Sequence, residues 1–88
     1  MIVAFTENAW ADYLYWQQHD KVIVERINLL IKEIKKEPFK GIGKPEPLRG
    51  NLSGYWSRRI DIVHRIVYHI EGVKNKQVLT IIQVRFHY

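Results

Sequence analysis

Apolar residues between positions 23 and 34 repeat every three or four residues, and this stripe constrains the fold most strongly. Its members are Ile23, Ile27, Leu30, Ile31 and Ile34. Such spacing places them on one side of an α-helix. Asp20 is the N-cap candidate, and Pro38 ends the helix at or just before Glu37. A helix with one apolar side must cover another layer, which the rest of the chain has to supply.

The remaining elements predict that layer to be a sheet. Residues 2–5 are short and apolar and predict a strand, after which Thr6 can cap a first helix that begins at Glu7. Residues 38–53 contain three prolines and three glycines and predict a loop. Three further strands are predicted at about 55–62, 64–71 and 77–87. The fold class is therefore α+β: one domain over residues 1–88, in which an N-terminal strand and a two-helix hairpin pack on a mainly antiparallel sheet.

Composition narrows the function classes. The chain has 88 residues and no cysteine, which excludes disulfides, thiolate metal sites and cysteine nucleophiles. It contains neither an apolar run that could span a bilayer nor a signal-peptide pattern, so we expect a cytoplasmic protein without a membrane partner. The net charge of +5 and the pI of about 9.6 favour a polyanionic partner such as nucleic acid.

Side-chain alternation along the predicted strands gathers polar residues on one face of the sheet. The residues predicted to share that face are Arg59, Arg65, Gln83, Arg85 and His87. The same alternation places Leu79 and Ile81 with them and directs Val84 and Phe86 towards the core. Arg58 points away from this face, where we expect packing or a salt bridge and a mild effect of Arg58→Lys.

Cleavage of RNA next to its own 2′-hydroxyl requires a base, an acid and cations that stabilise the phosphorane. Glu46 is the base candidate because prolines restrict its backbone on both sides, although a solvated loop glutamate would look the same. His87 is the acid candidate because imidazole exchanges protons near neutral pH; the alternative is a surface histidine in a frayed terminus. Arg65 and Arg59 are the phosphate candidates because a guanidinium fork fits phosphate oxygens, but solvated arginines at a sheet edge are the alternative.

Other residues are assigned weaker roles. The predicted contacts to the substrate backbone are Lys44, Arg49 and Arg85, and Tyr88 can stack on a base. His64 and His69 are interpreted as structural. The histidines are too scattered to predict a metal site, and no cofactor is expected.

Five stretches of the sequence resemble the YoeB (Txe) branch of the RelE toxin superfamily. They are residues 10–16 (WADYLYW), 43–48 (GKPEPL), 51–60 (NLSGYWSRRI), 64–68 (HRIVY) and the final pair 87–88 (HY). This resemblance implies a microbial-ribonuclease-like fold and a bacterial toxin paired with a YefM-type antitoxin. It also implies ribosome-dependent cleavage of mRNA in the A site.

The same resemblance assigns roles to individual positions. The family's catalytic glutamate falls on Glu46, its phosphate-stabilising arginine on Arg65 and its histidine acid on His87. A terminal aromatic falls on Tyr88 and a supporting arginine on Arg59. These implied roles coincide with those inferred from the chemistry of the residues.

Two other functions remain open at the level of sequence. A toxin resembling ParE would bind DNA gyrase without acid–base residues, and a non-catalytic RNA-binding module would not need Glu46. A homodimer is a further open assembly, because a domain this small buries only a modest core.

Overall fold

The computed structural model describes residues 1–86, so His87 and Tyr88 lie outside the described residues. The elements, in chain order, are β1 (Ile2–Phe5), α1 (Glu7–His19), α2 (Lys21–Lys36), β2 (Glu46–Pro47), the 3-10 turn η1 (Gly50–Leu52), β3 (Trp56–Arg59), β4 (Arg65–Glu71) and β5 (Val78–Gln83). The predicted α+β class is confirmed.

Both helices begin where the sequence predicts. The Thr6 hydroxyl accepts a hydrogen bond from the Ala9 amide at 3.2 Å, and Asp20 Oδ1 accepts from Val22 at 3.1 Å. In α2 the predicted stripe faces the core: Ile23, Ile27, Leu30 and Ile34 are buried, and Ile31 packs partly against them. Within the described part of the chain, neither helix is long and apolar enough to cross a membrane.

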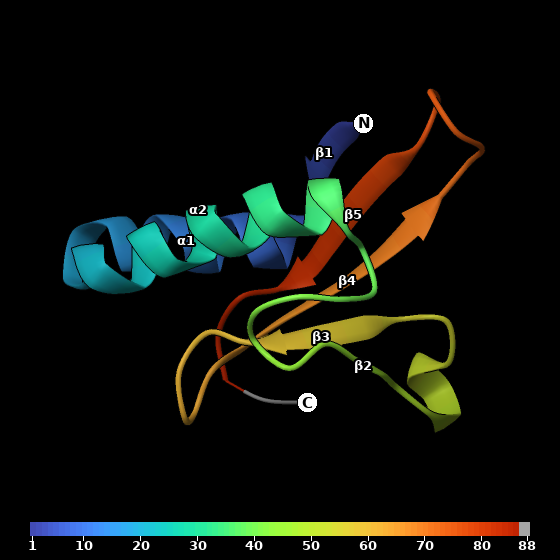
Figure 1. Cartoon of the computed structure of the whole chain (residues 1–88). Coiled ribbons are helices and arrows are strands. Elements are labelled where there is room, and N and C mark those ends of the chain that lie inside the picture. The colour runs from blue at the N-terminus through green and yellow to red at the C-terminus, as the bar shows by residue number, and fades with distance from the viewer. Residues whose placement is uncertain (87–88) are drawn as a thin grey trace.

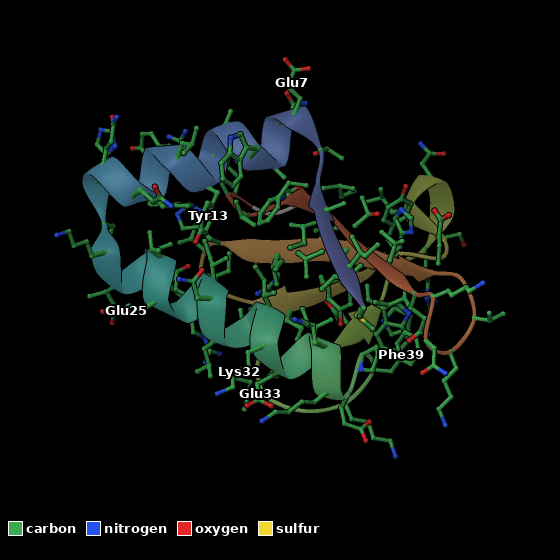
Figure 2. The ribbon with its side chains drawn as sticks, turned by 90° about the horizontal axis from the view of Figure 1, so that it is seen from above. Glu7, Tyr13, Glu25, Lys32, Glu33 and Phe39 are labelled. Carbon is green, nitrogen blue, oxygen red and sulfur yellow. The ribbon has the colours of Figure 1, made fainter. Side chains whose placement is uncertain are left out.

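The two helices lie side by side on one face of a five-stranded sheet (Figure 1). The strand order is β1-β5-β4-β3-β2; β1 pairs with β5 in parallel, and the other neighbours are antiparallel. Figure 2 shows Tyr13 between the helices, while Glu25 and Lys32 of α2 point away from the sheet. The Tyr13 hydroxyl donates to Asn28 of α2 at 2.7 Å and ties the helices together. The other face of the sheet is not covered by α1 or α2.

A bulge interrupts the ladder between β4 and β5. Tyr68 lies opposite Ile81, but Val67 lies opposite Gln83, so Ile82 is an extra residue on β5. Such a bulge reverses the side-chain alternation of the longer strand from that point onwards.

The predicted faces of the last strand are therefore wrong before the bulge. Leu79 and Ile81 are fully buried under the helices instead of lying on the polar face. Beyond the bulge, Val84 is buried as predicted. The strand ends at Gln83, not near position 87, and Phe86 is 55% exposed instead of facing the core.

Candidate active site

Glu46 lies on a short edge strand, not in the loop that the sequence predicts. β2 pairs antiparallel with β3, and Glu46 lies opposite Ser57. Prolines flank Glu46 without breaking the sheet because an edge strand tolerates missing amide donors. Further along, the Arg59 amide donates to the carbonyl of Gly43 at 2.6 Å. The segment from Gly43 to Glu46 therefore follows β3 closely.

A cross-strand row runs over the uncovered face from β2 to β5. Glu46 lies opposite Ser57, Ser57 opposite Val67, and Val67 opposite Gln83. Directly opposite residues in antiparallel strands point to the same side of a sheet. Ser57 and Val67 are buried in the middle of the row, whereas Glu46 is exposed.

Two arginines lie beside this row on the same face. Arg59 lies opposite Arg65. Arg59 comes two residues after Ser57, and Arg65 comes two residues before Val67. Strand spacings place the Cα atoms of Glu46 and Arg65 about 12 Å apart, so that their side chains can approach the two sides of one phosphate. The predicted common face is therefore confirmed for Arg59, Arg65 and Gln83.

Arg65 is partly buried, and its guanidinium carries a donor that no described residue uses. Its Nη1 atom is buried and has no hydrogen-bond partner among residues 1–86. A buried donor of this kind is costly to leave unpaired, so it favours an acceptor that arrives from outside the fold. Arg59 and Lys44 are exposed nearby, and Lys44 follows Gly43 directly.

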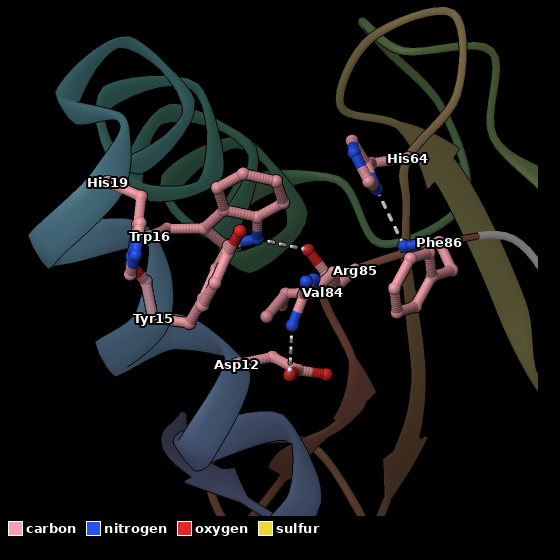
Figure 3. A network of polar contacts seen from close by, with 8 residues as sticks. All are labelled: Asp12, Tyr15, Trp16, His19, His64, Val84, Arg85 and Phe86. Atoms are coloured by element: carbon pink, nitrogen blue, oxygen red, sulfur yellow. Dashed lines mark hydrogen bonds and ion pairs between the residues drawn. The ribbon is translucent and has the colours of Figure 1, made fainter.

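Arg85 does not share the face of Arg59 and Arg65, and this part of the predicted arrangement is wrong. Its Nη1 atom lies 3.7 Å from Asp12 Oδ1 of α1, and its guanidinium lies 3.7 Å above the Tyr15 ring centre (Figure 3). The cause is the end of β5 at Gln83, after which strand alternation no longer applies. Arg49 is exposed two residues beyond β2. The predicted acid His87 and the predicted stacking residue Tyr88 lie outside the described residues.

Arg58 organises the loop that leads to Glu46. Its side chain is fully buried on the helix side of β3, which confirms the packing prediction. Its Nε donates to the Tyr68 hydroxyl at 3.2 Å, and its Nη atoms donate at 2.5 to 3.2 Å to the carbonyls of Glu37, Lys40 and Ile42. One partner is a side-chain hydroxyl and three are backbone carbonyl oxygens, so Arg58 is held by neutral oxygens and not by the carboxylate of a salt bridge. Arg58 thereby satisfies the C-terminal end of α2 and fixes the turn after it.

Neighbouring groups depend on this buried arginine. Burial raises the pKa of the Tyr68 hydroxyl above its ordinary 10.0, although the hydrogen bond and the charge of Arg58 oppose that rise. A Cβ atom at Gly43 would lie 3.0 Å from the Cβ of Arg58, so glycine permits the close approach of the loop, at a φ of +83°. The hint in the sequence was the pair of consecutive arginines, Arg58 and Arg59, because one of two neighbouring residues in a strand has to face the core.

The chain after β5 is bound by residues whose roles the sequence did not reveal. Trp16 Nε1 of α1 donates to the Val84 carbonyl at 2.9 Å, and the Phe86 amide donates to His64 Nδ1 at 2.6 Å (Figure 3). The Phe86 carbonyl in turn accepts from the Arg65 amide at 2.9 Å. The only hint was the position of His64 directly before the candidate arginine.

Together these side chains can bind a phosphodiester and accept a proton on one open face of the sheet. Among residues 1–86, no group of three or more histidine, cysteine, aspartate or glutamate side chains could hold a metal ion. A two-helix layer on one face of a mainly antiparallel sheet is the fold of the RelE-like toxins. More narrowly, residues 5–88 match the model of the YoeB-like toxin of bacterial type II toxin-antitoxin systems, and the chain belongs to this family.

Individual relatives agree with that assignment. Toxin YoeB of Synechocystis sp. is 60% identical over 88 residues, which cover 100% of this chain and 98% of the relative. A solved YoeB/ParE toxin from Agrobacterium tumefaciens has a TM-score of 0.98 at 51% identity, with both chains covered completely. The YoeB of Staphylococcus aureus has been solved as a dimer (TM-score 0.89, 42% identity) and in a heterotetrameric complex with YefM (0.88, 43%). Each match covers 100% of this chain and 98% of the other.

Proposed function

We propose that residues 1–88 form one toxin domain that cleaves mRNA in the A site of the cytoplasmic ribosome by metal-independent acid–base catalysis. Glu46 takes the proton of the 2′-hydroxyl, whose oxygen attacks the adjacent phosphorus. Arg65 and Arg59 stabilise the phosphorane, and His87 protonates the departing 5′-oxygen. The more peripheral substrate contacts are assigned to Lys44, Arg49 and Tyr88, and Arg85, which is held by Asp12 and Tyr15, is no longer among them.

The main support is Arg65 Nη1, a buried donor without a partner among residues 1–86, beside the row that ends in Glu46. A phosphate oxygen would satisfy this buried donor with a charge-assisted hydrogen bond. A carboxylate close to a phosphate would weaken binding by repulsion, so its position on this face is better explained by chemistry than by binding alone. The same argument disfavours the non-catalytic RNA-binding module.

Replacing Arg65 by lysine should lower the cleavage rate by roughly tenfold to a hundredfold, because loss of a preorganised donor to a developing oxyanion has effects of this size or larger. Lysine keeps the charge but lacks the planar fork. Arg59→Lys is the matched comparison, since Arg59 lies opposite Arg65 but is exposed, and its loss should be smaller. Single-turnover cleavage on programmed ribosomes measures both. Equal losses would contradict a special role for the buried fork.

The products test the reaction itself. Attack by the 2′-oxygen breaks the bond between phosphorus and the 5′-oxygen, leaving a 5′-hydroxyl fragment and a 2′,3′-cyclic or 3′-phosphate end. An mRNA with a single 2′-deoxy sugar at the cut should therefore resist cleavage, whereas the same substitution one nucleotide away should not protect it. Cleavage of the deoxy substrate at that bond would refute the mechanism. DNA breaks that depend on gyrase, with intact mRNA, would instead favour the ParE-like alternative.

We further infer control by a YefM-type antitoxin, supported by family membership and by the complex of the Staphylococcus aureus relative. An acidic segment that folds across the uncovered face would meet Arg59 and Arg65 and exclude mRNA. A homodimer is the second assembly, as solved for the same relative. With a net charge of +5, the chain should associate with its acidic partner more slowly as salt rises.

A further inference from the structure

Three hydrogen bonds to backbone atoms of Val84 and Phe86 hold the tail, residues 84–86, which follows β5. The Val84 carbonyl accepts from Trp16, the Phe86 amide donates to His64, and the Phe86 carbonyl accepts from the amide of Arg65. Arg85, between them, is held by Asp12 at 3.7 Å. The tail is therefore attached on both sides, to α1 and to the start of β4, although it has left the sheet.

Phe86 has a backbone conformation that the sequence does not favour. Its φ of +61° lies in the left-handed region, which is uncommon for a residue with a bulky side chain. Such a conformation persists only where the surroundings impose it. Its ring is 55% exposed and cannot supply that constraint by burial. The constraint comes from the two hydrogen bonds at its own amide and carbonyl, alongside the Arg85 guanidinium 4.6 Å from the ring centre and the His64 ring at a centroid distance of 5.8 Å.

His64 is itself fixed from several directions. Its amide donates to Asp61 Oδ1 at 2.6 Å, its carbonyl accepts from the Ile60 amide at 2.9 Å, and its ring meets the Trp16 ring edge-on at a centroid distance of 4.8 Å (Figure 3). Partial burial raises the pKa of Asp61, but hydrogen bonds from the amides of His64 and Val63 and the charge of Arg65 outweigh it and leave that pKa below 3.8. The ionised carboxylate therefore keeps the turn in place.

The Nδ1 atom of His64 has a role that ring packing alone does not explain. It accepts the Phe86 amide at 2.6 Å, which requires the neutral tautomer with its proton on Nε2. A purely structural aromatic residue at this position would need no ring nitrogen facing the tail. The acceptor is directed at the last residue before His87.

We propose that His64 is a positioning residue whose Nδ1 anchors the Phe86 amide and thereby fixes the main chain directly before His87, the proposed acid. The inference rests on the proposed nuclease function. Arg65 contributes to this arrangement through two groups. Its amide binds the Phe86 carbonyl, and its Nη1 atom, which has no partner among residues 1–86, can bind phosphate. Small displacements of a reacting group can lower rates severely, so a chain end bearing the acid needs such an anchor.

Two substitutions separate the acceptor from the ring. His64→Phe keeps an aromatic ring against Trp16 but removes the acceptor, whereas His64→Asn removes the ring and places an amide oxygen close to the former Nδ1 position. We expect His64→Phe to lower the maximal cleavage rate roughly tenfold to a hundredfold with little change in KM, and His64→Asn to recover much of that loss. His69→Phe is the control, because His69 pairs with Glu71 at the other end of β4. Its cleavage rate should stay unchanged.

A second measurement does not depend on activity. Hydrogen exchange of the Phe86 amide in the full chain should be slow in the wild type and His64→Asn, and at least tenfold faster in His64→Phe. If His64→Phe does not fold, His64→Gln replaces it, since its oxygen mimics Nε2 and not Nδ1.

The two measurements test the positioning role of His64 and the proposed nuclease function separately. Wild-type cleavage rates in folded His64→Phe, or equal losses in the asparagine and phenylalanine variants, would overturn the positioning role. A wild type that does not cleave mRNA would overturn the proposed function, while the exchange of the Phe86 amide would still decide whether His64 anchors the tail.

Discussion

Replacing Glu46 by glutamine should lower the single-turnover rate of mRNA cleavage by roughly 10²–10⁴-fold, the usual range for a positioned acid–base group. Glutamine keeps the size and hydrogen-bonding capacity of the side chain but cannot accept the 2′-hydroxyl proton. Stability should hardly change, because Glu46 is exposed on an edge strand. His87→Ala should produce a loss of similar size by removing the acid.

Glu71→Gln is the matched control for Glu46. Glu71 is also an exposed strand carboxylate, but it ends β4 at the opposite end from Arg65. Its replacement should leave the rate within about twofold, as is usual for a surface change away from a site. A Glu46→Gln variant that cleaves as fast as Glu71→Gln would show that Glu46 is not the base.

Replacing Arg58 by leucine should lower the free energy of unfolding by about 3–5 kcal/mol, since it strands several buried acceptors at once. Arg58 is fully buried and donates four hydrogen bonds, three of them to carbonyls of the loop after α2. Domains of this size are stable by only about 5–15 kcal/mol, so the loss approaches the limit of folding. Urea denaturation measures it directly.

Arg59→Leu provides the comparison, because this neighbour is exposed on the other face of the same strand. Its stability should change by less than about 0.5 kcal/mol. Arg58→Lys should also destabilise the fold, because one ammonium group cannot replace the fork; this reverses the mild effect expected from sequence. Equal denaturation midpoints for Arg58→Leu and Arg59→Leu would contradict the role of Arg58 in fixing the turn after α2.

Local signals were sufficient to predict the helices. Thr6 and Asp20 combine a capping side chain with a following helical pattern, and Pro38 leaves no doubt about the end of α2. The stripe of α2 also indicates which side faces the sheet. These features depend on neighbours in sequence, which a single chain reveals well.

Features set by distant partners could not be predicted in the same way. The bulge at Ile82 is hidden because apolar residues occupy both alternating sets of the strand, Leu79 and Ile81 in one and Ile82 and Val84 in the other, so either alternation fits the sequence. The exposed position of Phe86 follows from contacts with His64 and Arg65, which are about twenty residues away in the chain.

The candidate site also combines locally determined features, which the sequence predicts, with features set by distant partners, which it does not. Alternation alone correctly placed Arg59 and Arg65 on one face, because both lie on regular strands. The approach of Glu46 depends on the pairing of β2 with β3, and no pattern in a proline-flanked dipeptide predicts it. Arg58 explains how this segment reaches β3, because its guanidinium binds the carbonyls of Lys40 and Ile42 in the turn just before it.

The most direct test of nuclease function is to map mRNA ends after adding the wild-type chain to ribosomes stopped at a defined codon. Wild type and Glu46→Gln are compared, each with ribosomes and with the mRNA alone. The proposed mechanism predicts one cut within the A-site codon, with a 5′-hydroxyl on the downstream fragment, only for wild type and only on the ribosome. Intact mRNA with the folded wild-type chain on ribosomes, or equal cutting by Glu46→Gln, would contradict it.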